Sequence, residues 1–245
     1  HRDLHSFPTR RSSDLSATSI LEVGCGEGGN LKPFIELGCK TTGIDLTESK
    51  ISNANVLYAD EISKSAVTFV LGNIYHFSEA FKASYDLIIL KDTLEHIPEQ
   101  EKLIGLLKSF LKQGGKIFLA FPPWEMPFGG HQQMCKNKYL SLFPWIHLLP
   151  EFVYVRLLRI FLESQRTIDE LLEVKRTRIS IGRFEKILAT HNFKIDSVQF
   201  YFINPNYEIK FGLKPRKLWF WLSRIPVIRN FVTTTCYYLI SVKQN

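Results

Sequence analysis

The chain lacks several features that would place it outside ordinary globular proteins. Its 245 residues contain no internal repeat, no low-complexity tract, no recognisable signal peptide and no apolar run long enough to span a bilayer. The four cysteines form no CxxC pair, so their spacing indicates neither a disulfide framework nor a zinc site. We therefore expect a reduced, cytoplasmic protein that holds no metal.

Positive charge is scarce in the first half and abundant in the second. Residues 16–135 carry 10 Lys and Arg against 14 Asp and Glu, a net charge of −4, whereas residues 136–245 carry 18 against 8, a net charge of +10. A basic, aromatic second half predicts an anionic partner, such as a membrane surface, a phosphorylated substrate or a nucleic acid.

The first residues are left out of the fold prediction. Residues 5–15 back-translate, codon by codon, into a common sequencing-adapter oligonucleotide, so we interpret residues 1–15 as a read-through artefact. The first expected strand begins almost directly afterwards. The natural N-terminus is therefore expected to be missing, and residues 16–245 are expected to form one domain.

A glycine-rich turn between an apolar run and a helix organises the remaining sequence. Residues 20–23 are expected to form a buried strand, and Asn30 is placed to cap a helix over residues 31–37. Between them lie four glycines, Gly24, Gly26, Gly28 and Gly29. In doubly wound α/β folds such a corner binds a nucleotide at strand ends and a helix N-terminus.

Acidic residues around this turn favour one nucleotide over another. Gly24-x-Gly26-x-x-Gly29 also fits the dinucleotide fingerprint, and Asp45 follows where an acid would hold a ribose. Glu22 and Glu27, however, would repel a pyrophosphate placed on the turn. A ligand with an ammonium and a sulfonium group suits these acids better, so S-adenosylmethionine (SAM) is favoured over NAD.

The rest of the chain predicts an α/β fold. A helix is expected from Pro98 to Gly114-Gly115, and another over residues 180–191. Further strands are expected over residues 41–45, 67–71, 85–90, 116–121, 193–202 and 233–242. We predict a Rossmann-like sheet of seven mostly parallel strands, with helices on both faces and an antiparallel last strand.

Five motifs in this order resemble the class I SAM-dependent methyltransferases, in particular the branch of ubiquinone-biosynthesis and small-molecule or glycan methyltransferases. The motifs are Leu21-Glu-Val-Gly-Cys-Gly-Glu-Gly, Asp45, Asp86-Leu-Ile-Ile, Leu94-Glu-His-Ile-Pro98 and Leu111-Lys-Gln-Gly-Gly-Lys-Ile. The resemblance implies that the cofactor-binding residues are Glu22, Gly24, Gly26, Gly28, Asp45, Leu46, Asn73 and Lys91. Asp45 would bind the ribose and Asn73 the adenine edge, although a purely turn-forming role for Asn73 is an alternative.

The loop at residues 122–133 carries the candidate catalytic groups. It leaves the fifth strand and is therefore expected over the cofactor's methyl group. Its ionisable members are His131, a candidate general base for a hydroxyl acceptor, and Glu125. The alternative is that His131 only orders the loop. His96 is a weaker candidate, because in the family it usually holds its own loop in place.

A helical insertion is expected over residues 122–178. Its helix over residues 151–163 is apolar, with Arg156, Arg159 and Glu163 on one face. This pattern suits a lid over the substrate or, alternatively, an interfacial membrane helix. Residues 171–178 are charged and expected to be solvated.

The segment at residues 210–229 interleaves cations with aromatic side chains. Its members are Lys210, Lys214, Arg216, Lys217, Trp219, Phe220, Trp221, Arg224 and Arg229. No RNA-binding signature accompanies them, so peripheral attachment to the inner face of an anionic membrane, or a lipid-linked acceptor, is favoured over nucleic acid.

The expected function is SAM-dependent methyl transfer, at oxygen, to a small-molecule, glycan or lipid-linked acceptor. The alternatives are an NAD-dependent oxidoreductase and an inactive SAM-fold scaffold at a membrane.

Overall fold

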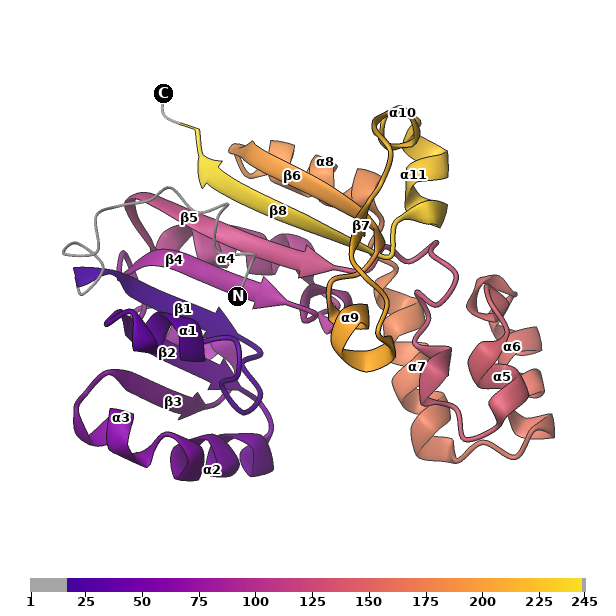
Figure 1. The fold of residues 1–245 in the computed structure, drawn as a ribbon, viewed down its shortest axis with the longest axis horizontal. Helices are drawn as coiled ribbons and strands as arrows, with labels where there is room; N and C mark the ends of the chain where they lie inside the picture. Colours follow the sequence, from indigo (N-terminus) through magenta and orange to yellow (C-terminus); the bar gives the residue numbers. More distant parts are fainter. Residues whose placement is uncertain (1–16, 244–245) are drawn as a thin grey trace. The chain divides into compact units, whose positions relative to one another are not determined.

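A computed structural model describes residues 17–243 (Figure 1), so the expected artefact at residues 1–15 lies outside the described residues. The described residues divide into two compact units, residues 17–90 with 105–118 and residues 91–104 with 119–243. Its α/β fold contains one sheet with the strand order β3-β2-β1-β4-β5-β8-β6-β7. The sequence predicts seven strands and the structure has eight, because Arg216–Lys217 pairs with β6 as β7. Two residues are too few to give a periodic pattern.

Parallel strands form the first unit. β1 (Ser19–Val23) pairs with β2 (Lys40–Asp45) and β4 (Tyr85–Lys91), and β2 pairs with β3 (Val67–Leu71). The intervening helices are α1 (Lys32–Glu36), α2 (Glu48–Leu57) and α3 (Ala59–Ser63) (Figure 1). Because the strands are parallel, Val23, Asp45 and Leu71 end at the same edge of the sheet.

Two expected boundaries differ from the structure. Asn30 does not cap α1, because the helix begins after Leu31, which is the N-cap residue and provides no side-chain cap. The side-chain amide of Asn30 instead donates to Glu22 Oε1 (2.7 Å). The helix α4 (Gln100–Phe110) is followed at once by β5 (Leu111–Phe121), so Gly114 and Gly115 lie within the strand and do not end the helix. Gly114 has φ 78°, a backbone conformation that glycine adopts without strain.

The second unit contains the antiparallel strands and the insertion. β6 (Phe193–Ile203) and β8 (Thr235–Val242) pair antiparallel, which confirms the expected orientation of the last strand. α8 (Ile181–Thr190) begins where Ser180 accepts a hydrogen bond from Arg183 N. Between β6 and β8 lie α9 (Asn206–Phe211), β7, α10 (Phe220–Ser223) and α11 (Pro226–Val232).

The insertion has a hydrophobic core of its own. Figure 1 shows α5 (Lys138–Leu142), α6 (Glu151–Ile160) and α7 (Gln165–Thr177) gathered together. Tyr154 and Leu158 of α6 pack in one buried cluster with Leu171 and Leu172 of α7. Residues 171–178 are therefore not a solvated segment as expected, because Leu171 and Leu172 belong to this core and Val174, Lys175 and Thr177 are buried as well. Within residues 17–243, no helix combines the length and the apolar character needed to cross a bilayer.

Candidate functional site

The glycine turn follows β1 and is closed by backbone hydrogen bonds to β2. The amides of Gly24 and Cys25 both donate to the carbonyl of Ile44, at 2.8 and 3.1 Å. Gly24, Gly26 and Gly28 all have positive φ, and a Cβ on Gly28 would lie 2.6 Å from Cζ of Phe69. The turn therefore requires glycine at position 28 for both its conformation and its packing.

Asp45 is fixed at the end of β2 by the turn itself. Its two carboxylate oxygens accept from Gly26 N (2.9 Å) and from Thr47 N (2.8 Å). Burial raises the pKa of Asp45, but the hydrogen bonds from Thr47 and Gly26 and the charge of Lys50 outweigh it, so the net pKa is lowered. Asp45 is therefore an oriented, ionised carboxylate at the carboxyl edge of the sheet.

The two acids of the turn have different environments. Glu22 is fully buried beneath it, held by Asn30. Glu27 is exposed and accepts from Asn53 Nδ2 (2.8 Å). Both acids lie close to the turn, as the choice of SAM over a dinucleotide assumes.

The remaining predicted cofactor residues lie at strand ends. Leu46 is 72% exposed, which leaves an apolar surface beside Asp45. The side-chain carbonyl of Asn73 accepts from Tyr75 N (3.1 Å) and caps a short 3-10 helix (Ile74–Phe77). Asn73 therefore has the turn-forming role that was the alternative to adenine binding. Lys91 ends β4, and its carbonyl accepts from Thr93 Oγ1 (3.1 Å).

A cluster of acids and histidines lies in the second unit, and we call Asp92, Glu95, His96 and His131 the acid–histidine cluster. Glu95 and His96 belong to a 3-10 helix after β4 (Leu94–His96), and His131 precedes another (Gln132–Met134). The rings of His96 and His131 have centroids 5.0 Å apart. Ligand atoms of Glu95, His96 and His131 lie within 4.8 Å of one another.

Burial dominates the electrostatics of this cluster. It raises the pKa of Glu95 well above its ordinary value, and the nearby charge of Asp92 raises it further. Burial lowers the pKa of His131 to about 4, and electrostatic repulsion from His96 and His147, when these are protonated, and from Lys210 lowers it further. At neutral pH the imidazole of His131 is therefore uncharged, with one nitrogen lone pair able to accept a proton.

Helix α9 adjoins the same cluster. Asn206 Nδ2 donates to Asp92 Oδ2 (3.3 Å). Burial raises the pKa of Tyr207, and the nearby charge of Asp92 raises it further. The sequence gives no sign of this contact, because Asp92 and Asn206 are 114 residues apart.

The structure brings together two of the three predicted catalytic residues. His96 and His131 are neighbours, whereas Glu125 is not a member of the cluster and burial raises its pKa. Glu95 lies beside these two histidines in the structure. It was not among the residues predicted from the sequence, although it directly precedes His96. The sequence shows that Glu95 is acidic, but its burial follows only from the folded chain.

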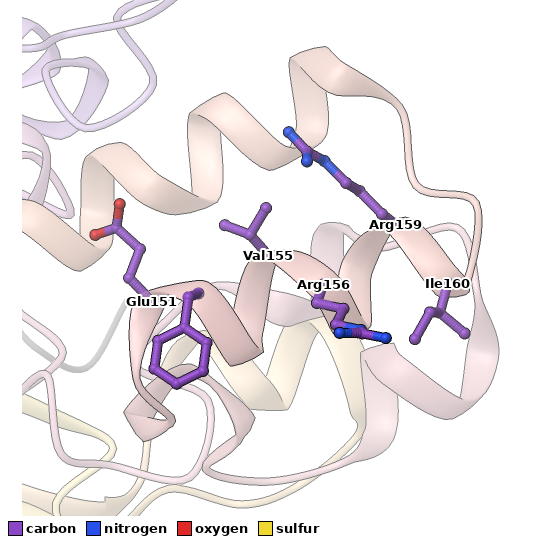
Figure 2. A pocket seen from close by; sticks show the side chains of 6 residues that line it. Glu151, Val155, Arg156, Arg159 and Ile160 are labelled. Carbon is purple, nitrogen blue, oxygen red and sulfur yellow. The ribbon is translucent and has the colours of Figure 1, made fainter.

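An open groove lies along α6 (Figure 2). It is lined by Glu151, Phe152, Val155, Arg156, Arg159 and Ile160. None of the predicted catalytic residues lines it. Glu163, expected on the same charged face as these arginines, is buried instead and accepts from the amides of Lys136 and Asn137.

The strand, the glycine turn and the acid at the end of the second strand define a nucleotide-binding α/β protein. A family model described as "Methyltransferase domain" matches residues 14–144, just over half of the chain. The chain belongs to this methyltransferase family, which confirms the resemblance to class I SAM-dependent methyltransferases and replaces the oxidoreductase alternative.

Curated relatives and solved structures agree with this family. The ubiquinone biosynthesis O-methyltransferase of Nitrosococcus oceani is 31% identical over 111 residues, 45% of this chain and 46% of that protein. The protein of the same name from Idiomarina loihiensis is 30% identical, over 46% of each chain. The chain thus matches about half the length of these relatives.

Two solved structures share the fold at low sequence identity. Phosphoethanolamine N-methyltransferase 2 of Haemonchus contortus, in complex with SAM, has a TM-score of 0.57 and 16% identity over 93% of this chain and 49% of its own. Magnesium protoporphyrin IX methyltransferase of Synechocystis, with bound S-adenosylhomocysteine, has a TM-score of 0.53 and 16% identity over 94% of this chain and 77% of its own.

Proposed function

We propose that this chain is an enzyme that transfers a methyl group from SAM to an oxygen of a small-molecule acceptor. The observation that carries the proposal is the glycine turn with Asp45 fixed beside it, in a chain of the methyltransferase family. The names of the curated relatives support oxygen as the acceptor atom.

The residues of the first unit fit the cofactor. The ionised Asp45 would accept from the ribose hydroxyls, and the exposed Leu46 would cover one face of the adenine. Glycine at positions 24, 26 and 28 keeps side chains away from the turn, where Glu22 contributes negative charge near the methionine end. Asn73 would contact the adenine edge, whereas Lys91, predicted for the methionine end, belongs to the second unit.

When bound, SAM supplies an already activated methyl group, so the chain must position the acceptor and remove its proton. We propose His131 as the general base, because its imidazole is neutral at physiological pH. His96 and Glu125 are weaker candidates. A pKa near 4 makes His131 a weak base in the free protein, so the acceptor's approach must assist proton transfer.

Calorimetry with S-adenosylhomocysteine tests the cofactor assignment. We expect binding by the full chain and, for Asp45→Ala, an affinity lower by roughly tenfold or more, since hydrogen bonds to charged groups contribute about 1.5–3 kcal/mol each. Asp60→Ala, the same change at an exposed acid, should leave the affinity unchanged. Tight NADH binding without binding of the homocysteine nucleoside would contradict the proposal.

A second proposal concerns residues 206–229, which favour an anionic membrane surface. Their apolar side chains are unusually exposed: Ile209 is 91%, Trp221 79% and Trp219 78% exposed. Lys214, Arg216 and Lys217 are exposed among them. Trp side chains and cations together suit a lipid headgroup layer, where each cation contributes about 1 kcal/mol.

Two of the expected cations have protein partners. Arg229 pairs with Glu185 (2.5 Å), and the guanidinium of Arg224 lies 4.6 Å from the ring centroid of Phe220. The membrane proposal therefore depends mainly on the lysines at 210, 214 and 217 and on Arg216.

Co-sedimentation with vesicles of anionic phospholipid tests the attachment. We expect binding at low salt that is lost at high salt and on changing Lys214, Arg216 and Lys217 to Glu. The matched control changes Lys32, Lys40 and Lys64, exposed lysines of the first unit, to Glu. Equal loss in both triple variants, or RNA binding without vesicle binding, would contradict a membrane site at this segment. Attachment of this kind would suit a lipid-linked acceptor.

A further inference from the structure

Three side chains of the acid–histidine cluster are arranged as ligands of one ion. We propose that Glu95, His96 and His131 form a binding site for a divalent transition-metal ion of the Zn²⁺ class. Their candidate ligand atoms lie within 4.8 Å of one another. This departs from the prediction of no metal, which rested on cysteine spacing, because these ligands are an acid and two histidines from separate loops.

The carboxylate of Glu95 supplies an independent reason. Glu95 is 3% exposed, and its Oε2 is buried without a hydrogen-bond partner among residues 17–243. The same described residues offer it no salt bridge. A buried carboxylate avoids the cost of an isolated charge by taking up a proton, by pairing or by coordinating a metal. A cation between Glu95 and the two imidazoles would satisfy the unpartnered oxygen.

Backbone contacts hold two of the ligands in place. The carbonyl of Glu95 accepts from Thr177 Oγ1 (2.5 Å). His131, with φ 57°, donates through its amide to the carbonyl of Phe128 (3.0 Å) and accepts at its own carbonyl from Met134 N (3.0 Å). Fixed ligands lower the cost of assembling a metal site.

Only a small closure is needed for coordination. Zinc binds imidazole nitrogen and carboxylate oxygen at about 2.0–2.2 Å, so ligand atoms in a tetrahedral site lie about 3.4 Å apart. His96 is exposed, and rotation of its side chain can bring its ring toward Glu95 and His131.

The ligand types select the class of ion. Magnesium and calcium prefer sites built mainly from oxygen ligands, whereas two imidazoles with one carboxylate suit zinc and related transition metals. Three protein ligands also leave a coordination position for water.

One consequence rests on the proposed role of His131 as a base. The lone pair that would take the acceptor's proton is the one that would bind the metal, so bound zinc and proton removal by His131 exclude each other. Added Zn²⁺ should therefore slow methyl transfer by the wild-type chain. If the wild-type chain catalysed no methyl transfer, this expected inhibition would be wrong, whereas the proposed metal-binding site would stand or fall by the binding experiment alone.

Binding is tested without SAM or acceptor. The full chain is freed of metal with a chelator and titrated with Zn²⁺ by calorimetry, and with Co²⁺ by visible absorption. We expect one ion per chain, and a dissociation constant raised by roughly 10- to 100-fold or more in His96→Ala and Glu95→Gln, because each loses a ligand. His96 is exposed, so its loss should not unfold the chain, and circular dichroism checks this.

His76→Ala, at an exposed histidine of the first unit, is the matched control and should bind as the wild type does. Absence of saturable binding to the wild-type chain would overturn the proposal. Undiminished binding by a folded His96→Ala variant would overturn it equally, since the ion would then lie elsewhere.

Discussion

Acidification should destabilise this protein through His147, a buried histidine of the insertion. His147 is 0% exposed, and its Nε2 is 2.8 Å from the carbonyl of Trp124, to which it donates. Its Nδ1 is buried with no hydrogen-bond partner among residues 17–243. Lys175 Nζ donates to the carbonyl of His147 (2.6 Å), so a protonated ring would place a second positive charge nearby. The native state therefore favours the neutral ring.

The size of the effect follows from the pKa of His147. Burial lowers it to about 4, and Lys175 lowers it too, against the opposing effect of the hydrogen bond to Trp124. Above about pH 6.5, the ordinary histidine pKa, both states are neutral and His147 contributes no pH dependence. Between about pH 6.5 and pH 4 only the unfolded chain binds the proton, so stability falls as pH falls. The loss reaches roughly 3 kcal/mol, at about 1.4 kcal/mol per pH unit.

Urea unfolding followed by tryptophan fluorescence measures this loss. His147→Gln keeps a donor for the Trp124 carbonyl and removes the titrating ring, so its stability should fall less between about pH 7 and pH 4.5 than that of the wild type. His76→Gln, at an exposed histidine, should keep the wild-type slope. Parallel curves for wild type and His147→Gln would refute the reasoning.

Further expected outcomes concern the glycines and His131. Gly28→Ala forces a Cβ to 2.6 Å from Phe69 at φ 81°, so both thermal stability and S-adenosylhomocysteine affinity should fall; an unchanged affinity would show that the turn does not hold the cofactor. Gly182→Ala in α8 meets no atom within 4 Å and should stabilise the chain by about 0.5–1 kcal/mol in urea unfolding; a destabilised variant would contradict the open space there. His131→Asn, which tolerates the left-handed backbone, should lower turnover by roughly 10²–10⁴-fold while calorimetry shows unchanged cofactor affinity; an unchanged rate would leave His131 only a structural role.

Local patterns in the sequence predicted the first unit well. The strand over residues 67–71 has the predicted bounds, and the glycine turn, Asp45 and Asn73 follow parallel strands as expected. Such elements depend on hydrophobic runs and turn residues that are adjacent in the chain. The predicted cap at Asn30 was wrong for a different reason, because the helix begins one residue later than expected and Leu31 occupies the N-cap position.

The acid–histidine cluster shows which information the sequence does not carry. His131 was selected because an ionisable side chain in a loop beyond a parallel strand is suited to catalysis, and that rule depends only on chain order. Its neighbour Glu95 lies 36 residues earlier, in a motif whose apolar residues gave no reason to expect a buried carboxylate. The cost of burying that charge exists only in the folded chain, where Thr177 and α7 cover the loop. Substituting Glu95 and His131 separately and together can therefore show whether they act as a unit, because coupled neighbours give non-additive changes and independent residues give additive ones.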